Sequence, residues 1–334
     1  MSRNTVSYAG MSKLERCALA ERIFVIYPRL KRLMDKMEHC LHYSKIAAEP
    51  ECMFIGGPAG AGKTTLQDYF LQKYPRTINA DGVIVPVLCA RVPNKATDKN
   101  LVTELLVRLG DPEAIKGSSY NQTTRLRKFM KGCQVWLVIL DEFQHFVDKD
   151  SQKVLKTVSD WLKNLIDQTE KPMILIGMPY ADQILDAVGN EQLQRRFAVR
   201  ERLDPFGWLT DEHQKEFRAF LKAVDNQLPL MEPSHLSDPI MAFRFYCATN
   251  GVIGKVMKII RRATELALEQ AEERITLDLL AEAYDDRLRA NHPDRVNPFR
   301  ENKSNLKIVT PAEPKSSLKK EKSSDIFKKK KLLV

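Results

Sequence analysis

The chain has 334 residues, 43% of them hydrophobic, and a formal net charge of +10 at pH 7. This length predicts one to three domains with a sizeable core. The chain has no apolar run of about 18 residues and no hydrophobic leader near Met1, which argues against a membrane span or a secretory signal. Its six cysteines form no Cys-x-x-Cys pair, which favours reduced thiols and a cytoplasmic protein over a disulfide or zinc framework.

The positive charge is concentrated near the C-terminal end. Residues 297–334 contain eleven Lys or Arg and four Asp or Glu, so they carry seven of the ten net positive charges. Because few of these residues are apolar, we expect a flexible basic tail over 293–334. Two interpretations of this tail remain open, a solubilising segment and a docking peptide for a partner protein or nucleic acid.

At the other end, residues 1–20 show only weak periodicity and are predicted to be an N-terminal extension. Apolar residues at helical spacing between Ile23 and Leu41 predict a helix, with Pro28 near its first turn.

Residues 57–64, Gly-Pro-Ala-Gly-Ala-Gly-Lys-Thr, fit the phosphate-binding pattern G-x-x-x-x-G-K-[ST] at every fixed position. A strand is predicted before this loop at 51–56 and a helix after it at 65–74, so several backbone N–H groups would face one phosphate chain. We expect Lys63 to reach the β- and γ-phosphates of ATP and the Thr64 hydroxyl to ligate Mg²⁺. The expected nucleotide-binding residues are Gly57, Pro58, Ala59, Gly60, Ala61, Gly62, Lys63, Thr64 and Thr65.

A second chemical signal is the apolar run 135–140, which ends in Asp141 and Glu142. A buried parallel strand delivers such carboxylates into the crevice at its C-terminal end. We expect Asp141 to hold the Mg²⁺ shell through water, and Glu142 to orient and polarise an attacking water.

Apolar runs at 82–90, 172–178 and 198–203 predict three more strands, and hence a five-stranded parallel sheet. Gly177 and Met178 stand where many ATPases of this type place a polar residue that touches the γ-phosphate. That polar sensor is therefore absent, or a neighbouring residue supplies it.

Arg195 and Arg196 end a predicted helix just before the fifth strand. A guanidinium is always charged and forks onto phosphate oxygens, so either arginine could reach the γ-phosphate of a neighbouring subunit. An exposed basic pair or a local salt bridge is the alternative.

Beyond Pro205 the pattern is helical, with helices predicted at 211–224, 234–248, 253–271 and 277–290. Thr97, Thr210 and Thr276 are expected N-caps. The sequence thus predicts an α/β nucleotide-binding domain over 21–206 and a helical lid over 207–292. Lys255 could bend back onto the nucleotide from the third lid helix, or be a surface lysine.

These motifs, in this order, resemble an AAA+ ATPase, and more closely the TniB/TnsC family of transposition ATPases. The resemblance covers roughly residues 20 to 290. Its motifs are Tyr27-Pro28-Arg29-Leu30, Gly56 to Thr64, Val138 to His145, Ile174 to Pro179, and Gln194-Arg195-Arg196-Phe197.

The resemblance implies an ATP-dependent homo-oligomer, a ring or helical filament, on double-stranded DNA. It also implies two partners, a TniQ-type target selector and a DDE-type transposase. Lys63, Thr64, Asp141 and Glu142 match the nucleotide and Mg²⁺ positions, Arg195 or Arg196 matches the arginine acting in trans, and Lys255 stands where a lid arginine is usual. The implied contacts to the DNA backbone, with little sequence preference, come from Lys95, Thr97, Lys99, Lys116 and Ser118.

Other functions stay open from the sequence alone. A P-loop kinase for a nucleotide or small molecule would not need Glu142 or an arginine acting in trans. An ATP-gated adaptor without hydrolysis would fit the nonpolar Met178. A helicase-loader-like protein would share the same overall architecture.

Overall fold

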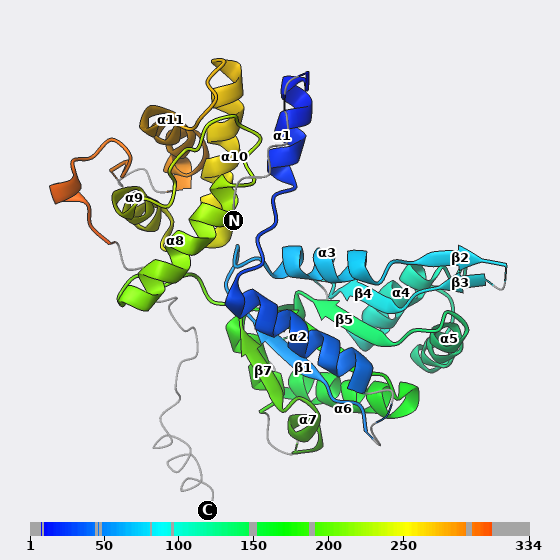
Figure 1. Cartoon of the computed structure of the whole chain (residues 1–334). Coiled ribbons are helices and arrows are strands. Elements are labelled where there is room, and N and C mark those ends of the chain that lie inside the picture. Colours follow the sequence, from blue (N-terminus) through cyan, green and yellow to red (C-terminus); the bar gives the residue numbers. More distant parts are fainter. Residues whose placement is uncertain are drawn as a thin grey trace, which may run out of the picture.

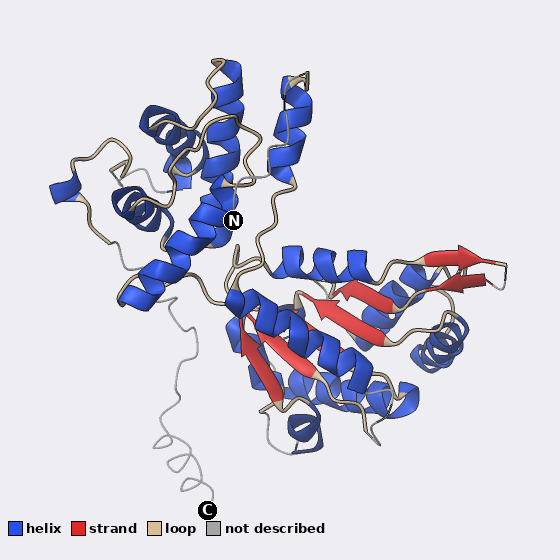
Figure 2. Cartoon of the chain, viewed as in Figure 1, coloured by secondary structure: helices blue, strands red, loops and turns tan. Residues whose placement is uncertain are grey.

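The computed structural model describes residues 8, 10–43, 46, 49–80, 82–94, 97–146, 152–186, 191–291 and 296–308. The chain forms an α/β unit around a five-stranded sheet (strands within 53–202) and a helical unit (helices within 211–287), shown in Figure 1 and Figure 2. Within the described residues, no helix combines the length and apolar character needed to cross a membrane.

The sheet has the strand order β4-β5-β6-β1-β7, and every neighbouring pair is parallel, as the sequence predicts. Parallel strands end at one common edge, so the loop after β1 and the last residues of β5 and β6 meet there. The strands are β1 (Met53–Gly56), β4 (Val87–Arg91), β5 (Leu137–Asp141), β6 (Met173–Gly177) and β7 (Val199–Arg202).

Helices cover both faces of the sheet because strand side chains alternate in direction. Met53 and Ile55 of β1 pack in the core that includes α2 and α3, whereas Phe54 packs in the core that includes α4, α5 and α6. Both faces are buried, which explains the continuous apolar runs of the strands. These helices are α2 (Pro28–Tyr43), α3 (Lys63–Lys73), α4 (Asp98–Leu109), α5 (Ser119–Gly132) and α6 (Gln152–Thr169).

The run 82–90 is not one strand, contrary to the prediction. Its first part, β3 (Gly82–Ile84), turns back and pairs antiparallel with β2 (Thr77–Asn79), and only its second part joins the sheet as β4. Pro86 separates the parts because it has no N–H to donate to a ladder. Its carbonyl accepts instead from the N–H groups of Trp136 and Leu137, at 2.8 and 3.1 Å.

The first long helix also differs from its prediction. Apolar spacing suggested a start near Ile23, but α2 begins at Pro28, and residues 23–27 are irregular. Proline disfavours helical geometry in the residue before it and fits the first helical turn. Residues 23–27 are thereby left to line the candidate site described below.

The helical unit contains α8 (Asp211–Asp225), α9 (Pro239–Thr249), α10 (Ile253–Glu269) and α11 (Leu277–Arg287). The predicted caps are confirmed, because the Thr210 hydroxyl accepts from His213 N at 3.2 Å and that of Thr276 from Leu279 N at 3.4 Å. Its apolar core is continuous with the core on the α2 face of the sheet.

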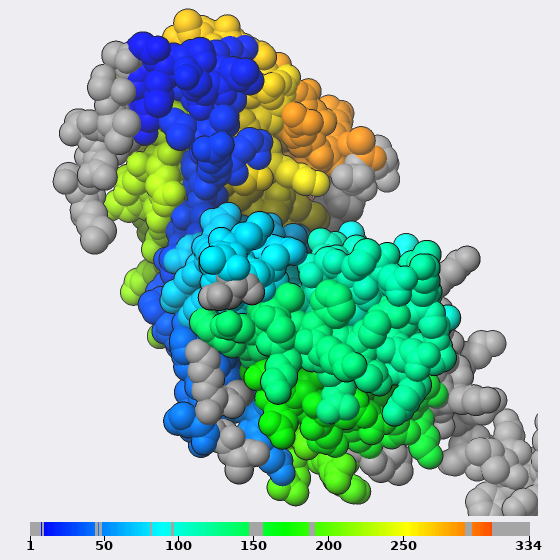
Figure 3. Space-filling model, turned by 90° about the vertical axis from the view of Figure 1, so that its right-hand side faces the viewer, coloured from blue at the N-terminus to red at the C-terminus, as the bar shows by residue number. Residues whose placement is uncertain are grey.

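The predicted N-terminal extension contains α1 (Lys13–Glu21), which packs against α10 (Figure 3). Arg16 forms a fork with Glu273 at 3.0 and 2.5 Å and also donates to the carbonyl of Pro229 at 2.8 Å. Lys13 lies 3.1 Å from Glu269. Helix α1 therefore joins the helical unit rather than extending freely from the α/β unit.

Residues 297–301, which the sequence predicts to be part of the flexible tail, pack on the helical unit. Asn297 and Phe299 are buried, and the buried Arg244 guanidinium donates to the carbonyls of Pro298 and, at 2.8 Å, Glu301. Residues 309–334, which hold most of the predicted tail, lie outside the described residues. Two 3₁₀ turns accompany this segment, η3 (Arg289–Asn291) and η4 (Lys303–Asn305).

Removing the Phe299 ring should destabilise the protein. The ring is 2% exposed and lies 5.2 Å from the ring of Phe245, so Phe299→Ala should lower the free energy of unfolding by about 3–5 kcal/mol. Chemical denaturation measures this loss. Val296→Ala is the matched control, since Val296 is 64% exposed and its change should cost less than about 0.5 kcal/mol. Equal stability of the two variants would mean that this segment is not docked.

Candidate nucleotide-binding site

The loop between β1 and α3 has the geometry that phosphate binding requires. Gly60 and Gly62 have φ values of +78° and +99°, a left-handed conformation that side chains rarely adopt. A Cβ on Gly57 would lie 2.7 Å from the Leu203 carbonyl oxygen, so this position also needs glycine. Helix α3 begins at Lys63, which places its free N–H groups at the loop.

The Lys63 ammonium lies over this loop. Its Nζ donates to the carbonyl oxygens of Gly57 at 2.6 Å and Pro58 at 3.0 Å. Burial lowers the pKa of Lys63, while the carboxylates of Glu142 and Asp141 act in the opposite direction. The Lys63 ammonium therefore interacts both with the carbonyl groups of the loop and with the charges of Glu142 and Asp141.

Asp141 ends β5 and is 7% exposed. Burial raises the pKa of its carboxyl group, and the N–H of Glu142, which donates to Oδ1 at 2.8 Å, opposes that shift. Carboxylate and hydroxyl oxygens are the hard ligands that Mg²⁺ prefers, usually together with substrate phosphates. The Asp141 carboxylate and the Thr64 hydroxyl are the oxygen donors that could hold such a metal ion.

Glu142 leaves the strand with a φ of +57°, which is uncommon for a residue with a side chain. Its Oε1 lies 3.4 Å from Nη2 of Arg91, at the end of β4. Its Oε2 accepts a hydrogen bond from Nε2 of Gln144. Glu142 also lines the same cavity as the phosphate-binding loop.

The cavity encloses about 400 Å³, within the size range of small-molecule sites. Three parts of the chain form its walls: the phosphate-binding loop, the irregular segment 23–27, and the first turns of α10. Phe24 in the second wall stacks on Tyr69 of α3 with ring centroids 4.8 Å apart. The lining outside the loop includes Ile23, Phe24, Val25, Tyr27, Leu30, Ile253, Gly254, Met257, Lys258 and Arg261.

The basic residues that α10 contributes to the cavity are Lys258 and Arg261, whereas the predicted Lys255 is not part of the lining. Gly254, Lys258 and Arg261 share one face because residues four apart, and seven apart, align on a helix. Arg261 also contacts Glu21, with Nε 3.2 Å from the carboxylate and Nη2 donating to the carbonyl at 2.7 Å. The lining therefore offers Lys258 and Arg261 as further basic residues for the nucleotide, while the role of Lys255 stays a prediction.

The two predicted arginines occupy different environments at the end of α7 (Glu191–Arg196). Arg195 is exposed, whereas Arg196 is largely buried and forms an ion pair with Asp167 of α6. Helix α7 leads into the start of β7, so it lies at the opposite edge of the parallel sheet from the phosphate-binding loop. Neither arginine lines the cavity of its own chain.

The loops predicted to contact DNA come together at the starts of α4 and α5. The hydroxyls of Thr97 and Ser118 cap these helices, accepting from Asn100 N at 3.1 Å and Asn121 N at 3.2 Å. Ser119 joins the two helices by donating to Asp98 at 3.1 Å. The predicted Lys99 and Lys116 are exposed, and Lys95 lies outside the described residues.

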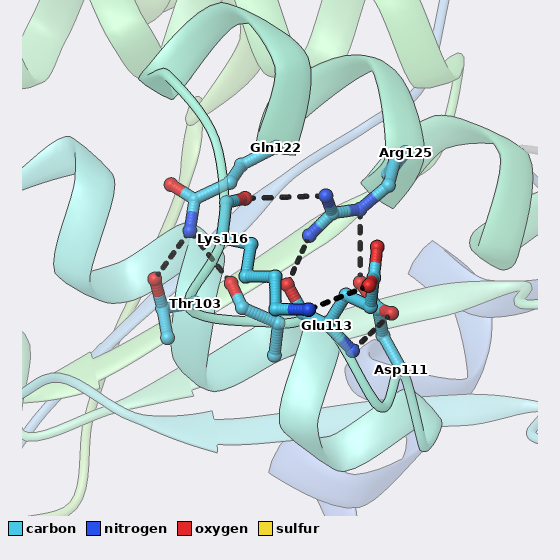
Figure 4. A network of polar contacts seen from close by, with 7 residues as sticks. Thr103, Asp111, Glu113, Lys116, Gln122 and Arg125 are labelled. Atoms are coloured by element: carbon cyan, nitrogen blue, oxygen red, sulfur yellow. Dashed lines mark hydrogen bonds and ion pairs between the residues drawn. The ribbon is translucent and has the colours of Figure 1, made fainter.

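A polar network holds the loop that presents Lys116 (Figure 4). Arg125 of α5 donates to Asp111 at 3.0 Å and to the carbonyls of Glu113 and Lys116 at 2.5 and 3.1 Å. The buried Gln122 amide donates to the Ala114 carbonyl at 2.6 Å. Lys116 itself pairs with Glu113 at 2.8 Å, an exposed contact that a stronger anion could replace.

Three parts of the site differ from the sequence-based predictions. The apolar spacing of segment 23–27 predicts a helix, whereas Pro28 indicates that the helix begins later. Lys258 and Arg261 follow Gly254 at helical spacing, so the sequence pattern could place them on the same face of the helix as Gly254. Gln144 stands two residues after Glu142, but nothing in the sequence shows that its side chain turns back toward that carboxylate.

The parallel sheet, the phosphate-binding loop after its β1 strand, the acidic pair at the end of β5 and the helical unit over the loop define an AAA+ fold. The chain belongs to the TniB family. A family model described as bacterial TniB protein matches residues 16–206, which confirms the resemblance found in the sequence.

Two solved proteins of similar structure share little sequence with this chain. The Aeropyrum pernix ORC2 protein, solved as ADPNP–ADP complexes, is 15% identical with a TM-score of 0.58, covering 83% of this chain and 72% of that one. The Aeropyrum pernix ORC1 protein, solved in complex with DNA, is 14% identical with a TM-score of 0.55, covering 81% and 69%. These likenesses establish the fold alone.

One curated sequence relative is origin recognition complex subunit 4 of Rattus norvegicus, 24% identical over 259 residues. The match covers 72% of this chain but only 55% of the rat protein. The chain therefore spans about half of that relative.

Proposed function

We propose that this chain is an ATP-hydrolysing, DNA-binding regulator of DNA transposition that works as a homo-oligomer on duplex DNA. The observation that carries the proposal is that Lys63 of the phosphate-binding loop and Glu142 line one cavity, under α10. Membership of the TniB family supports the transposition context. In this role the chain links a TniQ-type target selector to a DDE-type transposase.

The residues of the phosphate-binding loop and of the acidic pair each have a part in hydrolysis. Mg²⁺-ATP, when bound, would supply the γ-phosphoryl group for transfer to water, and the metal ion would neutralise the developing charge. The loop N–H groups and Lys63 would hold the phosphates, and the Thr64 hydroxyl and the Asp141 carboxylate would hold the metal ion and its water shell. Glu142 orients the attacking water and accepts a hydrogen bond from it. ATP favours the assembled state on DNA, and hydrolysis releases it.

One alternative has an observation in its favour. The end of β6 carries Gly177 and Met178, neither of which offers a polar side chain to the phosphate or to water. A protein that binds ATP, assembles on DNA and does not hydrolyse the nucleotide would fit this feature. A kinase fits less well, because Glu142 faces the cavity and an acceptor-binding subdomain would also be needed. A helicase loader shares the architecture and differs in its partners.

Exchanging Glu142 for Gln separates hydrolysis from binding. Glu142→Gln keeps the side-chain volume but removes the charge that polarises water, so ATP turnover should fall at least about 100-fold. Binding of a fluorescent ATP analogue and assembly on duplex DNA should remain. The measurement is phosphate release with and without DNA, and Lys63→Ala serves as the variant that fails to bind nucleotide. If wild type and Glu142→Gln both assemble on DNA and neither releases phosphate, the adaptor alternative is correct.

Arg195 is the better candidate for an arginine acting in trans, because Arg196 is held by Asp167 within its own chain. A shared site predicts complementation between two inactive variants. Arg195→Ala keeps a complete nucleotide pocket, while Lys63→Ala keeps Arg195. Mixing them should restore part of the DNA-dependent phosphate release, at sites that combine the nucleotide pocket of one variant with the arginine of the other. Mixtures no more active than the separate variants would place Arg195 outside the site.

The exposed lysines at the starts of α4 and α5 should contribute to DNA affinity through the phosphate backbone. Lys99→Ala with Lys116→Ala removes two such contacts, so the slope of log affinity against log salt should decrease by about 1.8 for any duplex sequence. Fluorescence anisotropy across a salt series measures this slope. Lys215→Ala with Lys222→Ala, on the exposed face of α8, is the control of equal charge. Equal slopes for the two double variants would place the DNA face elsewhere.

A further inference from the structure

Gln144 lies between the ends of β5 and β6. Its side chain forms a hydrogen bond with the residue that follows each strand, Glu142 and Met178. It belongs to the short turn η1 (Phe143–Phe146), which follows the acidic pair directly. Its Oε1 accepts the N–H of Met178 at 3.1 Å, and its Nε2 donates to the Glu142 carboxylate. The side chain is only 8% exposed, so these bonds lie in a largely dry environment, where they are stronger than in water.

The chemistry of its partners determines which way the Gln144 amide faces. A backbone N–H can only donate, so the amide oxygen must face Met178. The amide nitrogen then necessarily faces Glu142, whose carboxylate accepts. Buried Phe143 and Phe146 enclose the turn, which restricts the movement of the amide. A fixed donor is therefore aimed at Oε2 of Glu142.

Gly177 provides the space for this arrangement. A Cβ on Gly177 would lie 3.0 Å from Oε1 of Gln144 and 3.4 Å from its backbone nitrogen. A polar side chain at position 177 would therefore displace the Gln144 amide. The absence of a side chain at Gly177 thus leaves room for the Gln144 amide beside the end of β6.

We propose that Gln144 is a positioning residue for hydrolysis, which acts from η1 on the side chain of Glu142. It holds the Glu142 carboxylate in the orientation that faces the cavity. The inference rests on the proposed ATP hydrolysis and adds a residue to it. The other partner of Glu142 is Arg91, whose side chain is 68% exposed, so Gln144 provides the more fixed of the two contacts.

The test uses a variant that keeps shape and removes the donor. Gln144→Met fills a similar volume but cannot donate to Glu142, so kcat for ATP should fall by about tenfold or more, as expected for loss of a hydrogen bond to a charged group. Nucleotide affinity, measured with a fluorescent ATP analogue, should stay within about twofold, because only the orientation of Glu142 changes. Thermal unfolding of each variant checks that the fold is intact.

Two further variants distinguish positioning from simple packing. Gly177→Ala leaves Gln144 in the chain but crowds its amide, so it should also lower kcat while nucleotide affinity is unchanged. In the Glu142→Gln background, adding Gln144→Met should cause no further loss, because the carboxylate that Gln144 orients is already gone. Additive losses would overturn the proposal, since Gln144 would then act independently of Glu142.

Other outcomes are equally decisive. A kcat for Gln144→Met equal to that of wild type would overturn the positioning role, and a higher kcat would show that Gln144 restrains Glu142 instead. If Glu142→Gln lowers the rate and Gln144→Met does not, the inference fails while the proposed function stands. If wild type and Glu142→Gln hydrolyse ATP equally slowly, the proposed function fails and the inference with it.

Discussion

The close approach of Gly60 and Gly254 is the constraint on which the candidate site depends. The Gly254 N–H donates to the Gly60 carbonyl at 2.9 Å, which joins the phosphate-binding loop to the start of α10. A Cβ on Gly254 would lie 3.0 Å from that oxygen, so a side chain here would push the loop and the helix apart. The contact lies where a helix of the helical unit covers the loop. It thereby converts an open phosphate-binding loop into a cavity with opposing walls.

The parts of the site that are contiguous in sequence could be predicted, because their chemistry is local. The loop at 57–64 and the acids Asp141 and Glu142 each sit at the end of a buried strand, and the parallel sheet brings those ends together. The residues of the opposite wall could not be assigned in the same way. Whether Lys255 or Lys258 faces the loop depends on the rotation of α10, which is set by tertiary packing and the Gly60–Gly254 contact.

Irregular segments could not be predicted from the sequence pattern, because hydrophobic periodicity indicates only helices and strands. Residues 23–27 continue the apolar spacing of α2, yet Pro28 begins the helix and leaves them to line the cavity. The same limit applies to residues 82–90, where Pro86 divides an apolar run between a hairpin and the main sheet. In both cases a proline decided the outcome against an otherwise valid hydrophobic pattern.

Within the described residues, the chain crosses between the two units twice, and both crossings form part of the cavity. The first runs from α1, on the helical unit, through residues 22–27 to α2; the second runs from β7 through Leu203 to α8. Arg29 lies where they meet, 5.3 Å over the Phe206 ring and 3.9 Å from Glu216 of α8. Any rotation of one unit against the other must therefore reshape the walls of the cavity. By linkage, a ligand that binds one orientation of the two units more tightly than another favours that orientation.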